Sequence, residues 1–521
     1  MLSVRRFALL AVALAIGPFA GDAWAKLLRG TPGDDRLLGT AVADTIEGLG
    51  GHDLLRGRGG RDAIAGGPGN DRIAAHADVG RDTVRCGAGL DVVNAELHDM
   101  VAADCEVVAR QLSRDPFDVP EGQRESQVEP DSMAWGSTVV AAFQSSRFVS
   151  GGAAGIGWAT SRDGGRTWRS GHLPELSVYT SRAGRFEGVT DPVVAYDAAH
   201  GVWLIATLGL AEGSELVVSR STTGLAWSAP VVAAASPLED YDKEWVACDN
   251  WLSSPFRGTC YLAYLDLEGR RIAVRRSTDG GVTWSDAVVT AADRRLGGLV
   301  NGAFPVIRPD GSLVVAYTVF GFFDLAAGLI GAVRSIDGGV SFGPPVEIAR
   351  VHELSLLGMR APALVSADVD SAGRIRVAWA DCRFQEGCAG NTILVATSED
   401  GQTWQPPAQV AAVRGEAFVP GIAVSRDGSR VAVVFHVQTA EGVEIWLIES
   451  RDGGGTWRRP RLLSAEPMPL DWIVSTDIGR MLADYISVSY VAGRPVPVFA
   501  LASEPAGDAL RQAIFAATVI R

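Results

Sequence analysis

Seven aspartates near the front of the chain recur at a spacing suited to metal binding. They follow one another every nine residues, apart from one two-residue insertion, and an aliphatic residue stands two positions after each. Glycines lie in the intervening turns, where they let backbone carbonyls point inward, and carboxylates with carbonyls are ligands that calcium prefers. The pattern therefore predicts a calcium-binding repeat whose metal ligands are Asp35, Asp44, Asp53, Asp62, Asp71, Asp82 and Asp91.

The nonapeptide from Gly66 to Ala74 matches G-G-x-G-x-D-x-U-x in full. The run from Gly30 to Val93 thus resembles the hemolysin-type, or RTX, calcium-binding repeat, which implies a short parallel β-roll ordered by Ca²⁺. Without the ion, rows of carboxylates would repel one another and little apolar surface would remain, so we expect binding and folding to be coupled. Val42, Ala43 and the insertion at 75–79 lack the repeat's glycines, which predicts that some individual sites are empty.

A second motif, S-x-D-x-G-x-T-W, occurs six times with starts 52 to 63 residues apart, the spacing of one four-stranded propeller blade. Its Ser and Asp side chains suit a hairpin turn, where they bond backbone groups, while the glycines take positive φ and the aromatic residue packs beneath. One copy is degenerate, with Thr223 in place of the Asp. The copies lie at 161–168, 221–227, 277–284, 335–342, 398–404 and 450–457.

This motif resembles the Asp box, or BNR repeat, of sialidase-superfamily β-propellers, and the resemblance implies a structural role for it. Seven apolar strand starts accompany the six copies, and a strand from residues 105 to 125 is expected to complete the last sheet. The predicted fold class is therefore all-β, a short parallel β-roll followed by a seven-bladed, or alternatively six-bladed, β-propeller.

Ligands of propellers usually meet the mouth of the central channel, where the innermost strands begin. These strand starts carry charged and aromatic residues, and Lys243 is one of only two lysines in the chain. An acidic mouth with aromatic edges suits a sugar or a cation, whereas the alternative is that the same residues only cap strand ends. The predicted ligand-binding residues are Glu129, Asp131, Asp242, Lys243, Trp245 and Asp484.

The sialidase resemblance also implies a catalytic set of three arginines that bind a substrate carboxylate, a Tyr/Glu nucleophile pair and an Asp acid/base. The arginine motif F/Y-R-I-P expected before the first box is absent, and the boxes do not identify a reaction. A binding protein for an extracellular glycan or protein and an exo-α-sialidase-like glycoside hydrolase thus remain open. The candidate catalytic residues are Arg185, Arg360, Arg480, Tyr485, Glu244 (or Glu187) and Asp191 (or Asp131).

Residues 1–25 read as a signal peptide, with Arg5-Arg6, an apolar stretch and a small-x-small cleavage site, and no later segment suits a membrane span. The net charge of −14 argues against a nucleic-acid partner. We therefore expect a secreted or cell-surface protein with a roll at 26–110, a linker at 111–125 and a propeller at 126–521. Six cysteines in an exported chain predict the disulfides Cys86–Cys105, Cys248–Cys260 and Cys382–Cys388.

Overall fold

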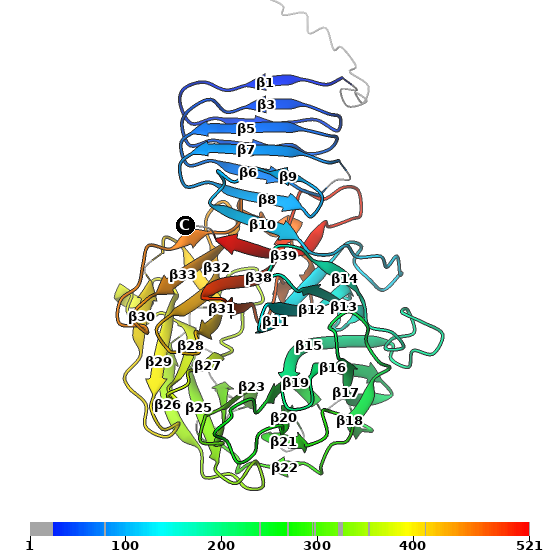
Figure 1. Cartoon of the computed structure of the whole chain (residues 1–521), viewed down its shortest axis with the longest axis vertical. Coiled ribbons are helices and arrows are strands. Elements are labelled where there is room, and N and C mark those ends of the chain that lie inside the picture. Colours follow the sequence, from blue (N-terminus) through cyan, green and yellow to red (C-terminus); the bar gives the residue numbers. More distant parts are fainter. Residues whose placement is uncertain are drawn as a thin grey trace, which may run out of the picture.

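A computed structural model describes residues 24–77, 80–238, 241–267, 270–293, 295, 299–320, 327–352, 355–411 and 413–519. These residues form β-strands and loops, with short 3-10 turns such as η2 (Glu386–Cys388) and η3 (Leu470–Trp472), so the all-β prediction is confirmed. None of the described helices is long and apolar enough to cross a membrane. Most of the predicted signal peptide lies outside the described residues. Figure 1 shows two units, a stack of short strands and a ring of larger sheets.

The stack is the predicted parallel β-roll. From Ile46 onward, one aliphatic residue from each repeat, such as Ile64, Ile73 or Val84, is buried between the two sheets, whereas Leu37 of the first repeat is partly buried. The first sheet contains β1 (Leu27–Arg29), β3 (Thr45–Glu47), β5 (Ala63–Pro68), β7 (Thr83–Ala88) and β9 (Met100–Val101). The second begins with β2 (Arg36–Leu38), β4 (Leu54–Arg56), β6 (Arg72–Ala75), β8 (Val92–Glu96) and β10 (Val107–Gln111).

The ring consists of antiparallel strand sets that follow one another along the chain, numbered here as sets 1 to 7. Set 1 is β11 (Gln127–Trp135), β12 (Thr138–Arg147), β13 (Ala153–Ser161) and β14 (Arg169–His172); set 2 is β15 (Gly188–Asp197), β16 (Val202–Ala211), β17 (Gly213–Ser221) and β18 (Val231–Ser236). Set 3 is β19 (Tyr241–Cys248), β20 (Cys260–Asp266), β21 (Arg271–Ser277) and β22 (Val288–Val289); set 4 is β23 (Leu299–Ile307), β24 (Leu313–Phe320), β25 (Ala327–Ser335) and β26 (Val346–His352).

The remaining sets complete the circle. Set 5 is β27 (Ser366–Val369), β28 (Ile375–Asp381), β29 (Thr392–Ser398) and β30 (Ala408–Ala411); set 6 is β31 (Glu416–Val424), β32 (Val431–Gln438), β33 (Val443–Ser450) and β34 (Arg461–Leu462). After a hairpin of β35 (Ser475–Thr476) and β36 (Gly479–Arg480), set 7 is β37 (Ser487–Val491), β38 (Arg494–Ala502), β39 (Gln512–Val519) and β10. The first strand of each set lies beside that of the next, and β37 lies beside β11. Each set begins near one of the seven strand starts identified in the sequence. The number of propeller blades stays a prediction.

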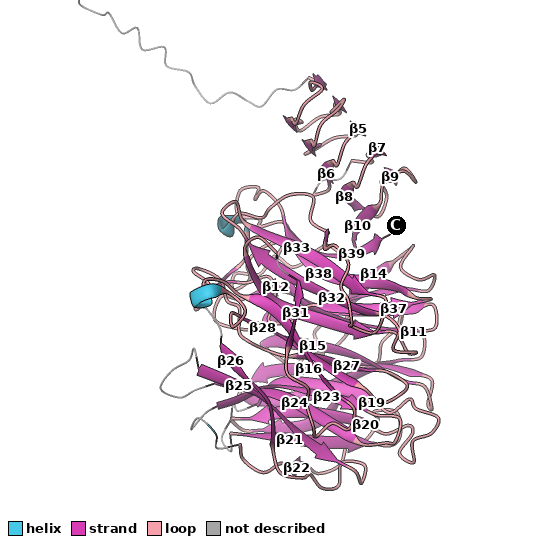
Figure 2. Cartoon of the chain, turned by 90° about the vertical axis from the view of Figure 1, so that its left-hand side faces the viewer, coloured by secondary structure: helices cyan, strands magenta, loops and turns pink. Residues whose placement is uncertain are grey.

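Strand β10 belongs to both units. It pairs in parallel with β8 of the roll and antiparallel with β39 of the ring, from Val107 opposite Val519 to Gln111 opposite Phe515. The expectation that a strand within residues 105–125 completes the last sheet is thus confirmed, and the predicted boundary at 110/111 falls inside β10. Figure 2 shows the roll continuing from the sheet that contains β38 and β39.

The repeated motif forms the turn chemistry expected of it. In the first copy, Ser161 Oγ accepts the Gly165 N–H at 2.8 Å, Asp163 Oδ1 accepts the Thr167 N–H at 2.9 Å, and Trp168 is buried beneath. The Thr167 hydroxyl donates to the second Asp163 oxygen at 2.6 Å. Matching Ser and Asp bonds recur in the turns that begin at Ser277, Ser335, Ser398 and Ser450. We call these features the Ser/Asp turns.

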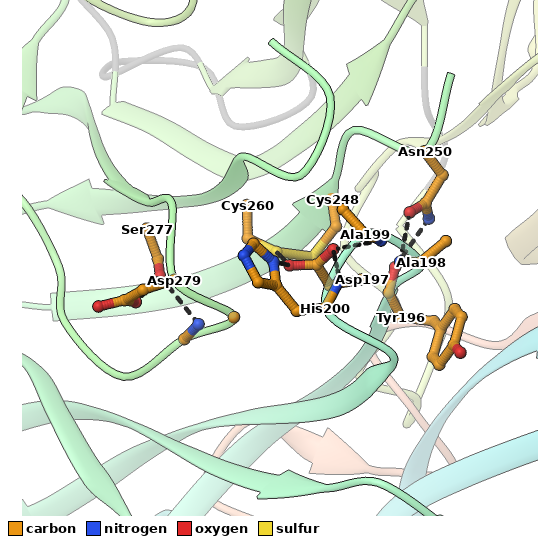
Figure 3. The surroundings of a disulfide bond; sticks show 12 residues. Tyr196, Asp197, Ala198, Ala199, His200, Cys248, Asn250, Cys260, Ser277 and Asp279 are labelled. Carbon is orange, nitrogen blue, oxygen red and sulfur yellow. Dashed lines mark hydrogen bonds and ion pairs between the residues drawn. A yellow bond between two sulfur atoms is a disulfide. The ribbon is translucent and has the colours of Figure 1, made fainter. Parts of the chain in front are cut away.

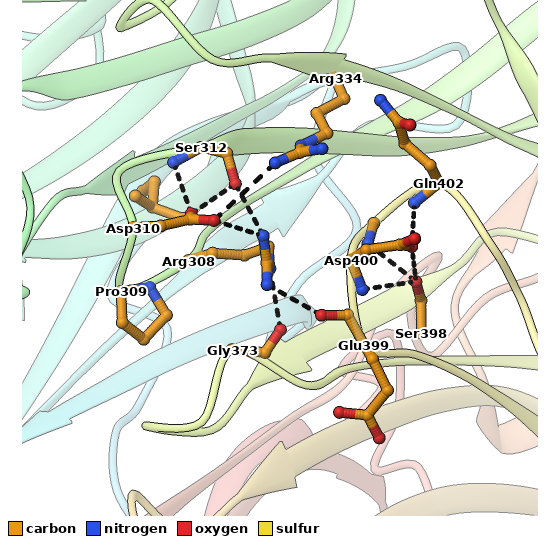
Figure 4. Close-up of polar contacts among 12 residues, drawn as sticks. Arg308, Pro309, Asp310, Ser312, Arg334, Gly373, Ser398, Glu399, Asp400 and Gln402 are labelled. Carbon is orange, nitrogen blue, oxygen red and sulfur yellow. Dashed lines mark hydrogen bonds and ion pairs between the residues drawn. The ribbon is translucent and has the colours of Figure 1, made fainter.

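In each of the later Ser/Asp turns, a backbone carbonyl accepts a hydrogen bond from an arginine of the preceding set. We call this contact an arginine clip. Figure 4 shows one case, in which buried Arg308 of set 4 donates to the Glu399 carbonyl of the set 5 turn at 2.8 Å and to the Gly373 carbonyl at 2.9 Å. The other clips are Arg162 to Thr223, Arg220 to Gly280, Arg276 to Gly338 and Arg376 to Gly453. Adjacent sets are therefore joined by charged donors on backbone acceptors.

All three predicted disulfides are present. Cys86–Cys105 joins the last turns of the roll, and Cys382–Cys388 closes the loop after β28. Cys248–Cys260 joins β19 to β20, and Figure 3 shows it beside the Asp197–His200 turn of set 2. There Asn250 donates to the Tyr196 carbonyl at 2.7 Å, which ties set 3 to set 2.

Candidate functional site

The repeat aspartates form hydrogen-bonded ladders along the roll. Asp53 Oδ1 accepts the Asp35 N–H at 2.9 Å, Asp71 Oδ1 accepts that of Asp53 at 3.0 Å, and Asp91 Oδ1 accepts that of Asp71 at 2.8 Å. A second ladder runs in the same way through Asp44, Asp62, Asp82 and Asp99. From Asp44 onward, one oxygen of each of these carboxylates therefore holds the backbone of an earlier turn.

The second carboxylate oxygens of Asp53, Asp71 and Asp91 are buried and have no hydrogen-bond partner in the described part of the chain. A Cβ at Gly66 would collide with Asp71 Oδ2 and with the Cys86 carbonyl, so oxygens from successive turns converge where glycine leaves room. Burial raises the pKa of Asp53 and Asp71, and that of Asp91 to about 6. A Ca²⁺ ion fits this set of hard oxygens and would supply the missing positive charge.

The first two repeats differ from the later ones. Asp35 Oδ2 accepts the Thr31 hydroxyl at 2.9 Å, and Asp44 Oδ2 accepts the Thr40 hydroxyl at 2.9 Å. Threonine stands there where the repeat consensus has glycine, and the carboxylates are satisfied within their own turns. This gives a physical reason to expect weaker calcium binding at the outer end of the roll.

A charged cluster occupies the channel end where the innermost strands begin. Lys243 Nζ lies 3.0 Å from Glu129, 2.8 Å from Asp191 and 2.9 Å from Asp484. Arg360 binds both oxygens of Asp484, at 2.8 and 2.5 Å. All except Arg360 are buried. We call these five residues the channel cluster.

A repeated β-bulge positions three members of the cluster. Glu129, Asp191 and Lys243 have φ of 52°, 52° and 47°, and the register of each innermost strand shifts at that point. Val419 and Gly302 occupy the same place in β31 and β23. A bulge re-aims a side chain, and a non-glycine residue in this region costs about 1–3 kcal/mol. The charged contacts offset that cost.

The electrostatics of the cluster keep Lys243 charged. Burial alone would lower its pKa, but Asp191, Asp484 and Glu129 outweigh that effect and raise the pKa well above its ordinary value. Burial raises the pKa of Glu129, whereas Lys243 and Arg360 overcome burial at Asp484 and hold its pKa well below the usual range. The charges therefore neutralise one another inside the protein.

The predicted nucleophile pair lies beside the cluster. Both Glu244 and Tyr485 are buried, and in the described part of the chain neither carboxyl oxygen of Glu244 has a hydrogen-bond partner. The Tyr485 hydroxyl donates to the Pro192 carbonyl at 3.2 Å. Burial raises the pKa of both groups well above their ordinary values. Burial therefore disfavours the charged form of each group.

Below the cluster, the channel contains a cavity of 630 Å³. Aromatic side chains contributed by four sets line it, among them Trp135, Trp245, Trp251, Phe304, Tyr485 and Tyr490. Arg426 lies at this cavity with its guanidinium carbon 4.5 Å from the centre of the Trp251 ring and 5.9 Å from that of Trp135. Buried Asp131 also lines the cavity and accepts the Val194 N–H at 2.7 Å.

The other predicted residues lie in separate places. Arg185 pairs with Glu215 and its side chain is 52% exposed, whereas Arg480 donates to the Ile473 carbonyl at 2.8 Å and to the Ser475 hydroxyl at 2.6 Å. Asp242 accepts the Asn301 amide at 3.2 Å next to the cluster. The structure thus holds the three candidate arginines with three different sets of partners, and their catalytic role stays a prediction.

Sequence reasoning did not single out Gln144 or Arg426. The Gln144 amide contacts Glu129 and donates to Thr190 at 2.9 Å, so it supports the cluster from the second strand of set 1. No spacing signal marks such a residue. Arg426 follows Ser425 in a Ser-Arg-Asp-Gly turn, and that similarity to the repeated motif was its only signal.

Comparison with known proteins gives one family match. The model of the RTX calcium-binding nonapeptide repeat, four copies, matches residues 29–64 and 38–73, and these repeats bind Ca²⁺. No curated protein sequence matches the chain.

Several solved structures are similar in fold. A protein of unknown function from Dyadobacter fermentans DSM 18053 is 18% identical, with 66% of this chain and 99% of that chain covered and a TM-score of 0.43. An ulvan lyase is 12% identical, with 78% and 95% covered and a TM-score of 0.48. Hadza microbial sialidase Hz136 is 17% identical, with 77% and 68% covered and a TM-score of 0.39. Likeness at this level does not assign a ligand or a reaction to this chain.

Proposed function

We propose that this chain is a secreted calcium-binding protein whose propeller binds an extracellular glycan in its central channel. The observation that carries the proposal is the 630 Å³ cavity with aromatic walls beneath the channel cluster. Indole and phenol rings pack against the apolar faces of sugars, while buried polar groups select hydroxyls, and cavities of this size accept small ligands. The predicted signal peptide, the disulfides and the calcium repeats support an extracellular setting.

Binding is favoured over catalysis because the reactive groups are engaged or sequestered. Lys243 contacts three carboxylates, and Tyr485 and Glu244 are buried with raised pKa values. A nucleophile pair needs an accessible group that can lose its proton. The cluster therefore acts as an internal brace for the channel.

The test is a glycan array with the purified mature protein, followed by calorimetry on the best ligand. We expect Trp251→Ala to weaken binding at least tenfold, because this half-buried ring lines the cavity. Phe384→Ala, at a side chain that is 50% exposed in the loop closed by Cys382–Cys388, is the control and should bind normally. If Trp251→Ala and Phe384→Ala bind the glycan equally well, the channel is not the ligand site.

An exo-α-sialidase-like glycoside hydrolase is the second candidate. Arg360, Asp191, Glu244 and Tyr485 do meet at one end of the channel, which favours it, although Arg185 and Arg480 have other partners. Turnover of a fluorogenic sialoside that is lost in Arg360→Ala and Tyr485→Phe would establish the enzyme. No turnover by a folded protein that binds glycans would support the binding function.

A further inference from the structure

A second cavity lies between the roll and set 6 of the propeller. This groove has a volume of 1360 Å³, and the proposed channel function does not use it. Its roll wall includes Asn70, Arg72, Leu90 and Val92, and its propeller wall includes Trp446, Arg458, Arg459 and Arg461. Both units are therefore needed to form it.

The roll wall is built around two of the calcium ligands. Asn70 and Arg72 flank Asp71 in the sequence, and Leu90 and Val92 flank Asp91. The Val92 N–H donates to the Asp71 carbonyl at 2.9 Å, while the second carboxylate oxygens of Asp71 and Asp91 have no hydrogen-bond partner in the described residues. Calcium that binds these oxygens orders the strands that carry the wall.

Polar contacts across the base hold the two walls at a set separation. Arg72 pairs with Glu444 at 3.0 Å and donates to the Ala465 carbonyl at 2.8 Å. The Asn94 amide donates to the Leu463 carbonyl at 2.9 Å and accepts the Ala465 N–H at 2.6 Å. The groove is thus a fixed feature of the calcium-ordered protein.

The five arginines and five glutamates of the groove balance in formal charge, but several of the arginines have guanidinium nitrogens that are open to a ligand. The guanidinium groups of Arg414, Arg458 and Arg459 have no hydrogen bond or ion pair in the part of the chain that is described. Arg461 Nη1 is buried and likewise lacks a partner among those residues. Three of the groove's five glutamates are already engaged: Glu444 by Arg72, Glu416 by the Asn391 N–H and Glu106 by the Asp91 N–H.

We infer that the groove binds an acidic oligosaccharide and that calcium gates this binding. Guanidinium groups match carboxylates and sulfates with paired hydrogen bonds, and half-buried Trp446 offers an indole face to a sugar ring. These unpartnered guanidinium groups offer local hydrogen-bond donors to an anionic ligand in a chain whose net charge is −14. Because one wall flanks calcium ligands, loss of the ion would remove half of the site.

Calorimetry in calcium with a heparin-derived octasaccharide, hexagalacturonate and maltohexaose tests the ligand class. We expect the two acidic probes to bind and the neutral one to bind at least tenfold more weakly. Trp446→Ala and the double change Arg458→Ala with Arg459→Ala should each weaken acidic binding at least tenfold. Arg166→Ala, at an exposed arginine of the set 1 turn, should not.

Three results would overturn the ligand assignment: no acidic saccharide binds, the groove variants bind normally, or octaglutamate binds as tightly as the saccharides. In the last case the groove would recognise charge alone. Trp251→Ala in the channel should leave heparin binding unchanged, so this inference and the channel proposal fail separately.

The calcium gate is tested with heparin, whose sulfates need no calcium bridge. Asp71→Asn with Asp91→Asn should lower affinity at least tenfold, whereas Asp34→Asn, at an exposed carboxylate outside the predicted ligand set, should change it less than threefold. Circular dichroism of each variant checks the fold. Equal heparin affinity in the presence of calcium and in the presence of a chelator would show that binding does not depend on calcium.

Discussion

Aspartates of the roll and of the propeller show how one residue type serves two purposes. In the Ser/Asp turn, Asp163 accepts two backbone N–H groups and the Thr167 hydroxyl, so both of its oxygens are satisfied by its own turn. In the roll, Asp71 uses one oxygen for the neighbouring turn, and its other oxygen is buried without a partner in the described residues. A satisfied carboxylate completes a fold, whereas an unsatisfied one needs a ligand.

The two regions also differ in how their apolar surface is arranged. The roll has a narrow row of aliphatic side chains, but the propeller has large clusters between adjacent sets. Ala74 and Val92 of the roll belong to the cluster that also contains Val498 and Phe515 of set 7. The calcium-dependent order of the roll is therefore linked to the sheet of set 7 through β10 and this shared core.

The largest expected effect follows removal of calcium. A chelator should abolish amide protection from Leu27 to β10, because each site contributes about 4 kcal/mol when free calcium is 1,000 times its Kd. Hydrogen exchange measured by mass spectrometry should show an intermediate loss of amide protection in β39 and no loss of protection in sets 3 and 4. Added magnesium is the control and should not restore protection. Unchanged exchange in the roll would contradict the dependence on calcium.

Lys243→Met tests the propeller's internal charge balance. The change leaves Glu129, Asp191 and Asp484 with Arg360 as the only remaining cation of the cluster, and breaking a buried pair costs about 3–5 kcal/mol. Urea unfolding should show this loss, whereas exposed Arg166→Met should change stability by less than about 0.5 kcal/mol. A small effect of Lys243→Met would mean that the cluster is not a brace.

Thr223→Asp tests whether a satisfied aspartate stabilises a turn. The set 2 turn has the same length as that at Ser398, where Asp400 accepts the N–H groups of Gln402 and Thr403 at 2.8 and 2.7 Å. Thr223 Oγ1 already accepts the Leu225 N–H at 3.2 Å, so an aspartate should add one further bond, worth about 0.5–1.5 kcal/mol. The melting temperature should rise for Thr223→Asp. It should not rise for Thr223→Asn, whose amide oxygen is a weaker, neutral acceptor. A lower melting temperature for both would refute this reading of the turn.

Acid should weaken the Ser/Asp turns only at low pH. Backbone hydrogen bonds, that from Thr403 above all, lower the pKa of Asp400 from 3.8 to about 2. Because the folded value lies below the unfolded one, the stabilisation is complete above pH 3.8 and disappears as the pH falls toward 2. The stability difference between the wild type and Asp400→Asn should be constant from pH 7 to 5 and shrink below 4. A difference that already shrinks at pH 6 would disprove this assignment.

The sequence by itself determined the local chemistry of this protein. Nine-residue spacing predicts the roll, the S-x-D-x-G-x-T-W spacing predicts the turns, and pairs of nearby cysteines predict the disulfides. In each case the interacting residues lie close together in the chain or repeat with a regular period, so the pattern is visible without the fold. The strand that completes the last set was predicted for a different reason, since a last set with a missing strand needs one.

Only the tertiary structure decided which distant residues meet. Lys243 of set 3 meets Glu129, Asp191 and Asp484 from three other parts of the ring, the arginine clips join neighbouring sets, and the groove joins the roll to set 6. Such contacts depend on strand register, on bulges and on the closure of the ring. The sequence alone does not show them, because each depends on the position at which separate sheets come together.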